Sequence, residues 1–330
     1  MILVTGATGF LGSELVRQLH LQGKKVKALK RATSAIPQIL KGITGIEWAD
    51  ADMLDYFSLE KAFEGISRVY HCAATISFQP ADKKKMLRVN EEGTAHIVDL
   101  CLEKGIDKLV HVSSVAALGE AKPQEQVTEK AFWEFDGRQG GYSISKYESE
   151  MEVWRGIAEG LCAVIVNPSV IIGKNAGTGG SGQIFEMVRK GLRFYTDGTC
   201  GMVAVEDVAR AMIMLMDSDI HSERFILNAE NLPLREVFEE TAKAYNVQAP
   251  SIRVGRWMMG IGWRLTALIS AISGREFGLT KETARSSRKK TDFSSEKFLK
   301  LFPDFRFKPV RESIREICTK DFNTGKHPQR

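Results

Sequence analysis

The sequence has few of the features that mark disulfide-rich, zinc-binding or membrane-spanning proteins. Its five cysteines include no Cys-x-x-Cys pair and form no cluster with histidine at zinc spacing. This pattern argues against a disulfide framework and predicts no metal site, and it favours buried free thiols in a reducing compartment. The apolar start MILVTG is too short for the hydrophobic segment of a secretory signal, so we expect a cytoplasmic protein.

Long apolar runs and dense basic runs are also scarce. The longest apolar stretch, WMMGIGWRLTALISAIS (257–273), contains one charge and is shorter than the ~20 residues of a membrane span. We expect a helix of a substrate-binding lobe there, with peripheral membrane contact as the alternative. The densest basic stretch, ARSSRKK (284–290), is short and has no interleaved aromatic residue, so we expect no nucleic-acid partner.

The first two-thirds of the chain alternate β-rich and helical segments. This alternation predicts an α/β fold with a doubly wound parallel sheet, covered by helices on both faces, as in Rossmann domains. The expected strands are 2–5, 25–29, 46–50, 68–73, 108–114 and 162–167, and the expected helices are 10–21, 59–64, 84–104 and 143–159.

After Pro168 the alternation loosens, which predicts a second, smaller lobe. GKNAGTGGSG (173–182) contains five glycines and is expected to be a flexible loop. A strand and helix return over 202–217, another strand over 224–228, and the remainder from Leu232 has a helical pattern. We therefore expect a dinucleotide-binding domain at 1–169 and about 201–229, a mostly helical substrate lobe at about 170–200 and 230–320, and a flexible tail at 321–330.

The stretch TGATGFLGS (5–13) predicts a phosphate-binding turn between a strand and a helix. Gly6 permits the tight turn, Gly9 lets a pyrophosphate approach the backbone, and Gly12 lets the helix pack against the sheet. Free N–H groups at the start of the helix favour an anion. The glycine spacing differs by one residue from the usual G-x-G-x-x-G. The predicted cofactor loop comprises Gly6, Thr8, Gly9, Phe10, Leu11 and Gly12.

Two cations follow the second expected strand, where many NAD-binding proteins have an acid that holds the ribose 2′-hydroxyl. Lys30 and Arg31 favour a 2′-phosphate instead, so NADP(H) is the expected cofactor and NAD(H) the alternative. Neighbouring strand residues point to opposite faces, and one of the two is expected to reach the ligand. The other interpretation is that both are solvated surface charges.

The stretch YSISK predicts an acid–base pair. Tyr142 and Lys146 lie four residues apart at the start of a helical segment, about 6 Å apart along one helix face. A cation there favours the tyrosinate and lowers the phenol pKa from its usual ~10. Such a tyrosine can donate a proton to a carbonyl or accept one from an alcohol. Ser113 and Ser114 end the preceding strand, where a hydroxyl can orient the same oxygen.

With these residues the chain resembles the extended short-chain dehydrogenase/reductases over about residues 1–320. The motifs follow in family order: TGATGFLG, ADMLD (51–55), HCAA (71–74), VNEEGT (89–94), VSSVAALG (112–119), YSISK and VNPSVIIG (166–173). Within that family it is most similar to dihydroflavonol 4-reductase-like enzymes and their bacterial relatives.

The resemblance implies roles for individual residues. Tyr142 would be the proton donor, Lys146 would bind the nicotinamide ribose, and Ser114 would be the catalytic serine, with Ser113 as the second choice. The implied cofactor contacts are Asp52 and Met53 near the adenine, Ala73, Ala74 and Thr75 along the ribose and phosphates, Pro168, Ser169 and Val170 beside the nicotinamide, and Asn90, which is more often structural in this branch.

The expected function is reduction of a carbonyl, or oxidation of a secondary alcohol, in a partly apolar small molecule. Aromatic residues at 132, 133, 135, 257 and 263 are candidates for pocket walls or for ordinary packing. The family also implies a homodimer formed through the helices that carry Asn90 and Tyr142. The substrate itself and the physiological direction are not predicted.

Two other functions remain open. A sugar epimerase is the first, although CGM (200–202) stands where nucleotide-sugar epimerases tend to have a basic residue for a diphosphate. Val115 and Ala116 also replace the acid pair of sugar dehydratases. The second alternative is a nucleotide-binding sensor or assembly factor without chemistry, a class that usually lacks the tyrosine or lysine found here.

Overall fold

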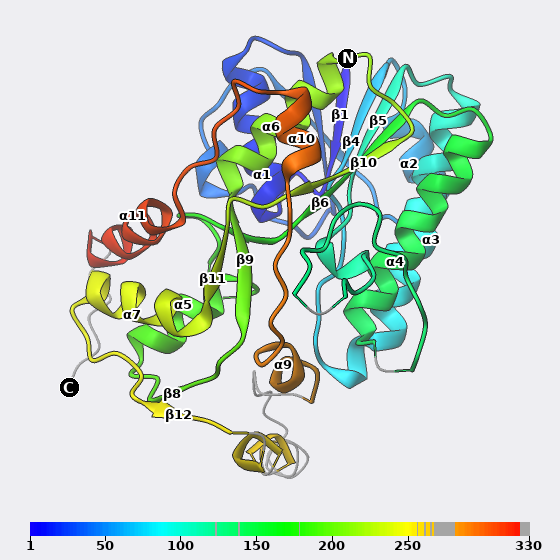
Figure 1. The fold of residues 1–330 in the computed structure, drawn as a ribbon. Helices are drawn as coiled ribbons and strands as arrows, with labels where there is room; N and C mark the ends of the chain where they lie inside the picture. The colour runs from blue at the N-terminus through cyan, green and yellow to red at the C-terminus, as the bar shows by residue number, and fades with distance from the viewer. Residues whose placement is uncertain are drawn as a thin grey trace.

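The computed structural model describes residues 1–122, 124–137, 139–177, 179–255, 257–260, 262–264, 266 and 281–323. Its centre is a seven-stranded sheet in which every neighbouring pair is parallel (Figure 1). Across the sheet the strands are β3 (Ile46–Asp50), β2 (Val26–Lys30), β1 (Ile2–Thr5), β4 (Arg68–His71), β5 (Lys108–Val112), β6 (Ala163–Pro168) and β10 (Glu223–Leu227). The strand order reverses between β1 and β4, and ligands of such sheets bind at this point.

Helices cover both faces of the sheet because successive strand residues point to opposite sides. In β1, Ile2 and Val4 belong to one hydrophobic core and Leu3 to the other. The first core lies under α1 (Phe10–Leu21), α6 (Val205–Asp217) and α10 (Glu296–Leu301), and the second under α2 (Tyr56–Ala62), α3 (Lys83–Glu103) and α4 (Gly141–Ala158). The expected doubly wound fold is therefore confirmed.

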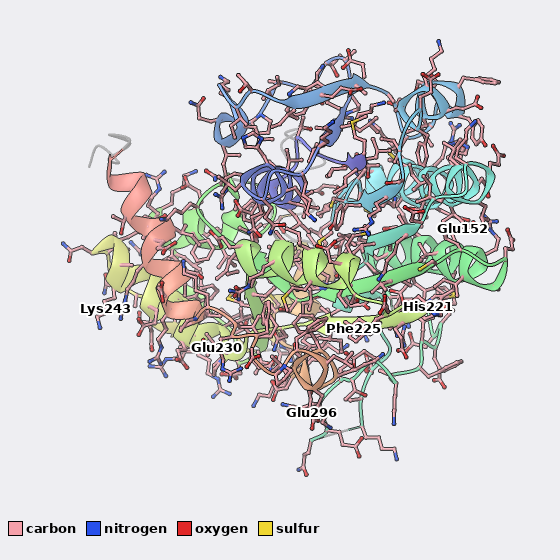
Figure 2. All side chains as sticks on the ribbon, turned by 90° about the horizontal axis from the view of Figure 1, so that it is seen from above. Glu152, His221, Phe225, Glu230, Lys243 and Glu296 are labelled. Carbon is pink, nitrogen blue, oxygen red and sulfur yellow. The ribbon has the colours of Figure 1, made fainter. Side chains whose placement is uncertain are left out.

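The C-terminal half adds a smaller, mostly helical region with two short sheets. It contains β7 (Val170–Ile172), α5 (Gly182–Arg189), β8 (Phe194–Tyr195), β9 (Thr199–Ala204), β11 (Glu230–Pro233), α7 (Leu234–Tyr245), β12 (Ile252–Arg253), α9 (Lys281–Ser286) and α11 (Val310–Asn323). A third core unites Phe185, Val237 and Ile314 from α5, α7 and α11. In Figure 2, Lys243 of α7 and Glu152 of α4 lie on opposite sides of the molecule.

Three expectations about local structure differ from the fold. Helix α2 begins three residues before the expected 59–64, because Asp55 caps it by accepting from the Ser58 N–H at 3.3 Å. Strand β12 interrupts the helical pattern expected after Leu232, and β11 extends to Pro233. Helix α11 continues to Asn323, so the first three residues of the expected 321–330 tail are helical; 324–330 lie outside the described residues.

The cysteines are all free thiols, but only two of the five are fully buried. Cys101 and Cys318 are buried, whereas Cys72, Cys162 and Cys200 are half-buried, which corrects the expectation of five buried thiols. Within the described ranges, no helix combines the length and apolar character needed to cross a membrane. The described residues also contain no cluster of three or more His, Cys, Asp or Glu side chains that could bind a metal ion.

Candidate active site

Four loops that carry expected site residues meet at one edge of the sheet. Because the strands are parallel, the carboxyl ends of β1, β4, β5 and β6 all lie at this edge. The loops that follow them contain 6–12, 73–75, 113–114 and 168–170. Segments separated by up to about half the chain thus become neighbours at the point where the strand order reverses.

The glycine loop after β1 has the shape that a dinucleotide phosphate requires. Gly6 adopts φ +64°, and a Cβ atom there would lie 2.7 Å from the Ala73 nitrogen. A Cβ atom at Gly12 would lie 2.1 Å from the Gly6 carbonyl oxygen. Helix α1 has no side-chain cap at Gly9 and no acid in its first turn. Its first N–H groups and positive end therefore suit an anion, and the loop fits the expected cofactor.

A chain of buried hydrogen bonds links this loop to the loop after β4. The Ala73 N–H donates to Thr5 Oγ1 at 3.1 Å, and Thr5 Oγ1 lies 2.7 Å from His71 Nδ1. The Thr94 hydroxyl donates to the Asn90 carbonyl at 2.6 Å and accepts from His71 Nε2 at 3.0 Å. The Thr94 contact assigns the proton of the neutral His71 ring to Nε2, so Nδ1 accepts from the Thr5 hydroxyl. Burial lowers the pKa of His71 to about 3, so the imidazole is neutral.

The loop after β4 is also fixed to the helix that carries Tyr142. The Asn90 side chain accepts from the Thr75 N–H at 2.7 Å and donates to the Thr75 carbonyl at 2.9 Å. Its Nδ2 also donates to Ser145 Oγ in α4 at 3.1 Å. Asn90 is buried, so its contacts are those of a structural bridge between α3, α4 and this loop. Beside Asn90, Ala74 is exposed and Thr75 is half-buried.

The structure brings Ser114, Tyr142 and Lys146 together. Tyr142, in the first turn of α4, is hydrogen-bonded to the Ser114 side chain. Lys146 is buried one turn further, where its ammonium donates to the Val112 carbonyl at 2.9 Å. Burial lowers the pKa of Lys146 to about 8, against the opposing charge of Glu150.

The expected direction of the Tyr142 pKa shift is wrong. Burial raises the pKa of the Tyr142 phenol, and the hydrogen bond with Ser114 is the opposing influence. Lys146 directs its ammonium to the backbone of β5 instead. The phenol is therefore held in its protonated form, which is the form that can donate a proton.

Ser113 points to a different network, centred on a buried carboxylate that the sequence reasoning missed. Glu150 is 1% exposed and accepts from Ser113 Oγ at 2.5 Å and from Asn167 Nδ2 at 2.8 Å. Arg224 of β10 pairs with the other carboxylate oxygen at 3.1 Å and donates to the Glu129 carbonyl. The spacing of Glu150 four residues after Lys146 is the available sequence signal, since it places both on one helix face.

The two cations after β2 differ in their surroundings. Lys30 forms a 2.5 Å ion pair with Asp50, its partner in the β2–β3 register. Arg31 is exposed, and no ion pair forms at its guanidinium within the described part of the chain. Farther along this edge, Asp52 is exposed and accepts from the Leu54 N–H, while Met53 is half-buried against α3.

The three residues expected beside the nicotinamide lie at the end of β6. Pro168 closes the strand, and Val170 begins β7. Ser169 between them is buried and donates its N–H to the Leu227 carbonyl at 3.0 Å. These contacts fix the backbone at this position beside the Ser113–Ser114 loop.

The aromatic candidates divide into packed and exposed residues. Trp133 stacks on Tyr147 of α4 with 4.6 Å between ring centroids, so it packs the helix. Phe132 and Phe135 are 80% and 70% exposed, and Trp257 is 88% exposed. Trp263 is half-buried, with the Arg264 guanidinium over its ring. Sequence reasoning missed Phe78, whose ring centroid lies 5.5 Å from that of Tyr142.

Comparison with known proteins gives results that agree with this geometry. Residues 2–227 match the model of the NAD dependent epimerase/dehydratase family. Sterol demethylase protein B of Methylococcus capsulatus is 31% identical over 78% of this chain and 79% of its own length. A Synechocystis protein named as a dihydroflavonol 4-reductase is 32% identical over 77% of this chain and 75% of its own. The crystal structure of gox2253 is 29% identical, covers 99% of both chains and has a TM-score of 0.84.

Proposed function

Because the chain belongs to the NAD-dependent epimerase/dehydratase family, we propose that it is a nicotinamide-dependent reductase acting on a carbonyl of a partly apolar small molecule. The observation that carries this proposal is the placement of the Ser114 side chain beside the Tyr142 phenol, with Lys146 buried one turn away. These three groups lie at the sheet edge that also carries the glycine loop.

The chemistry follows from the protonation of these groups. The Tyr142 phenol, kept protonated by burial, donates its proton to the substrate carbonyl oxygen. The Ser114 hydroxyl orients that oxygen and stabilises the tyrosinate that remains. The buried Lys146 ammonium adds positive charge on the same helix face. In the reverse direction Tyr142 accepts the proton of a secondary alcohol.

The cofactor supplies the hydride when it is bound. The residues that would hold it are the glycine loop for the pyrophosphate, Ala73 to Thr75 and Lys146 along the riboses, and Pro168 to Val170 beside the nicotinamide. We further propose that NADP(H) is preferred over NAD(H), because Arg31 is exposed and unpaired within the described chain at the end of β2.

The proposed substrate class rests on apolar residues in the loops that lead into α3 and α4. Phe78 contacts the Tyr142 ring, and Ile76 in the same loop is 57% exposed. Phe132 and Phe135 are exposed in the loop that leads into α4. This supports a ketone or aldehyde on a hydrophobic skeleton, a class that agrees with the words dihydroflavonol and sterol in the names of two relatives.

The test is Tyr142→Phe, which removes the proton donor and keeps the ring. We expect kcat/KM for carbonyl reduction to fall by ~100-fold or more, the usual contribution of general acid catalysis. Tyr147→Phe is the matched control, because it keeps the stack on Trp133 and should retain full activity. The measurement is NADPH oxidation with a panel of apolar ketones. A Tyr142→Phe variant as active as the wild type would refute the mechanism.

Sugar epimerisation is the second candidate, favoured by the description of the matching family. Strand β9 (TCGMVA) carries no basic side chain to pair with a sugar diphosphate, which speaks against it. The two activities are separable because an epimerase returns the hydride within one turnover. Formation of the epimer with no net change in nicotinamide absorbance would favour this candidate. Binding of NADPH with neither activity would favour a non-catalytic sensor.

A further inference from the structure

The N-terminus of α4 is in contact with a carboxylate from α9, far along the chain. A Cβ atom at Gly140 would lie 1.8 Å from Glu282 Oε1, so the carboxylate fills the space that any other side chain at position 140 would need. Gly140 has φ −74° and ψ 161°, a conformation open to all residues. Its lack of a side chain is therefore required by the close approach of Glu282 and not by the backbone.

The Glu282 carboxylate supplies the cap that the N-terminus of α4 lacks. Gly140 is the N-cap of α4 and offers no side-chain hydrogen bond, and the first turn contains no acid. The Gly141 N–H donates to the Glu282 carboxylate, and Lys83 at the start of α3 faces the same carboxylate with its charge. Burial raises the pKa of Glu282, while this hydrogen bond and the Lys83 charge oppose the rise. A carboxylate at this place complements the positive end of the helix.

The contact between Glu282 and the start of α4 lies next to the proposed proton donor, Tyr142. The N–H bound by Glu282 belongs to the Gly140–Gly141 peptide unit, one residue before Tyr142 in the first turn of α4. The phenol must meet Ser114, and a misplacement of about 1 Å at a reacting group can cost about 100-fold in rate. A carboxylate that fixes this turn thus affects the geometry of the Ser114–Tyr142 pair.

We propose that Glu282 is a positioning residue, which holds the first turn of α4 so that Tyr142 faces Ser114 and the substrate. The role in catalysis rests on the proposed reductase function; the contact itself does not. Because α9 belongs to the C-terminal region, Glu282 also ties that region to the helix that carries Tyr142 and Lys146.

The contact is tested by a double-mutant cycle on unfolding. Glu282→Ala and Gly140→Ala should each lower the thermal midpoint by about 1–4 °C, the range of a helix-terminal carboxylate. In the Glu282→Ala background, Gly140→Ala should have a smaller effect, because the added methyl group then meets no carboxylate and only the lower N-cap preference of alanine remains. Additive shifts of the thermal midpoint would show that Glu282 and position 140 are not in contact. Glu239→Ala, an exposed acid of α7, is the charge-matched control.

The positioning role is tested by kinetics on the full chain. Glu282→Ala should lower kcat about tenfold with the NADPH dissociation constant unchanged. Glu282→Gln should restore most of the rate, since its amide oxygen still accepts from Gly141. If kcat is unchanged in Glu282→Ala while the unfolding cycle is non-additive, the contact between Glu282 and Gly140 exists but the positioning role is refuted. Absence of reductase activity in the wild type would instead refute the proposed function.

Discussion

Neighbouring residues in this site have unrelated partners. Ser113 and Ser114 are adjacent, yet the first donates to the buried Glu150 and the second meets Tyr142. Two further residues, His71 and His111, pair across β4 and β5 with ring centroids 5.1 Å apart. Neither ring nitrogen of His111 has a hydrogen-bond partner among the described residues. Burial lowers the pKa of both imidazoles, and that of His111 lies well below its usual value.

At the scale of single residues this pair predicts acid sensitivity. Below pH ~6.5 each histidine binds a proton in the unfolded chain but not in the folded one, so stability falls by up to ~1.4 kcal/mol per pH unit for each. His111→Leu should remove one of these contributions. Urea unfolding at several acidic pH values measures the slope. His221→Leu is the control, because His221 is exposed. An identical slope in wild type and His111→Leu would contradict the prediction.

At the scale of elements, the end of β2 decides which cation is available to a ligand. The register of β2 with β3 places Lys30 against Asp50, and the chain then leaves the sheet with Arg31 exposed. The planar guanidinium can bind a phosphate through two hydrogen bonds. The strand pairing therefore separates two adjacent basic residues that look equivalent in the sequence.

This difference predicts the cofactor preference. A charge-assisted hydrogen bond contributes ~1.5–3 kcal/mol, which corresponds to ~10- to 100-fold tighter binding of NADPH than of NADH. Arg31→Ala should abolish most of that preference, whereas Lys30→Ala should change it little. Fluorescence titrations of both nucleotides at fixed moderate salt give the dissociation constants. Equal affinity of the wild type for the two nucleotides would refute the NADP assignment.

At the scale of the whole molecule, α3 and α4 pack side by side on one face of the sheet (Figure 1). Leu87 and Met151 of these helices are half-buried apolar residues. We expect two copies of the chain to associate through this face into a dimer of about twice 36.8 kDa. Met151→Arg should shift the mass measured by light scattering toward the monomer. A wild-type protein that is monomeric at micromolar concentration would contradict this expectation.

The sequence by itself determined the features that depend on residues close along the chain. The glycine turn, the alternation of strands and helices, and the spacing of Tyr142 and Lys146 all follow from local backbone geometry and periodicity. These signals were sufficient for the doubly wound fold, which the structure and the family match confirm.

Only the tertiary structure decided the features that join distant segments. It brought Phe78 to Tyr142, Glu282 to Gly140 and Arg224 to Glu150, and it reversed the expected pKa shift of the tyrosine. Each of these depends on burial and on partners that packing brings together from far apart in the chain. Hydrophobic periodicity specifies which face of an element is buried but not which side chain lies opposite, and for this reason these contacts were absent from the prediction.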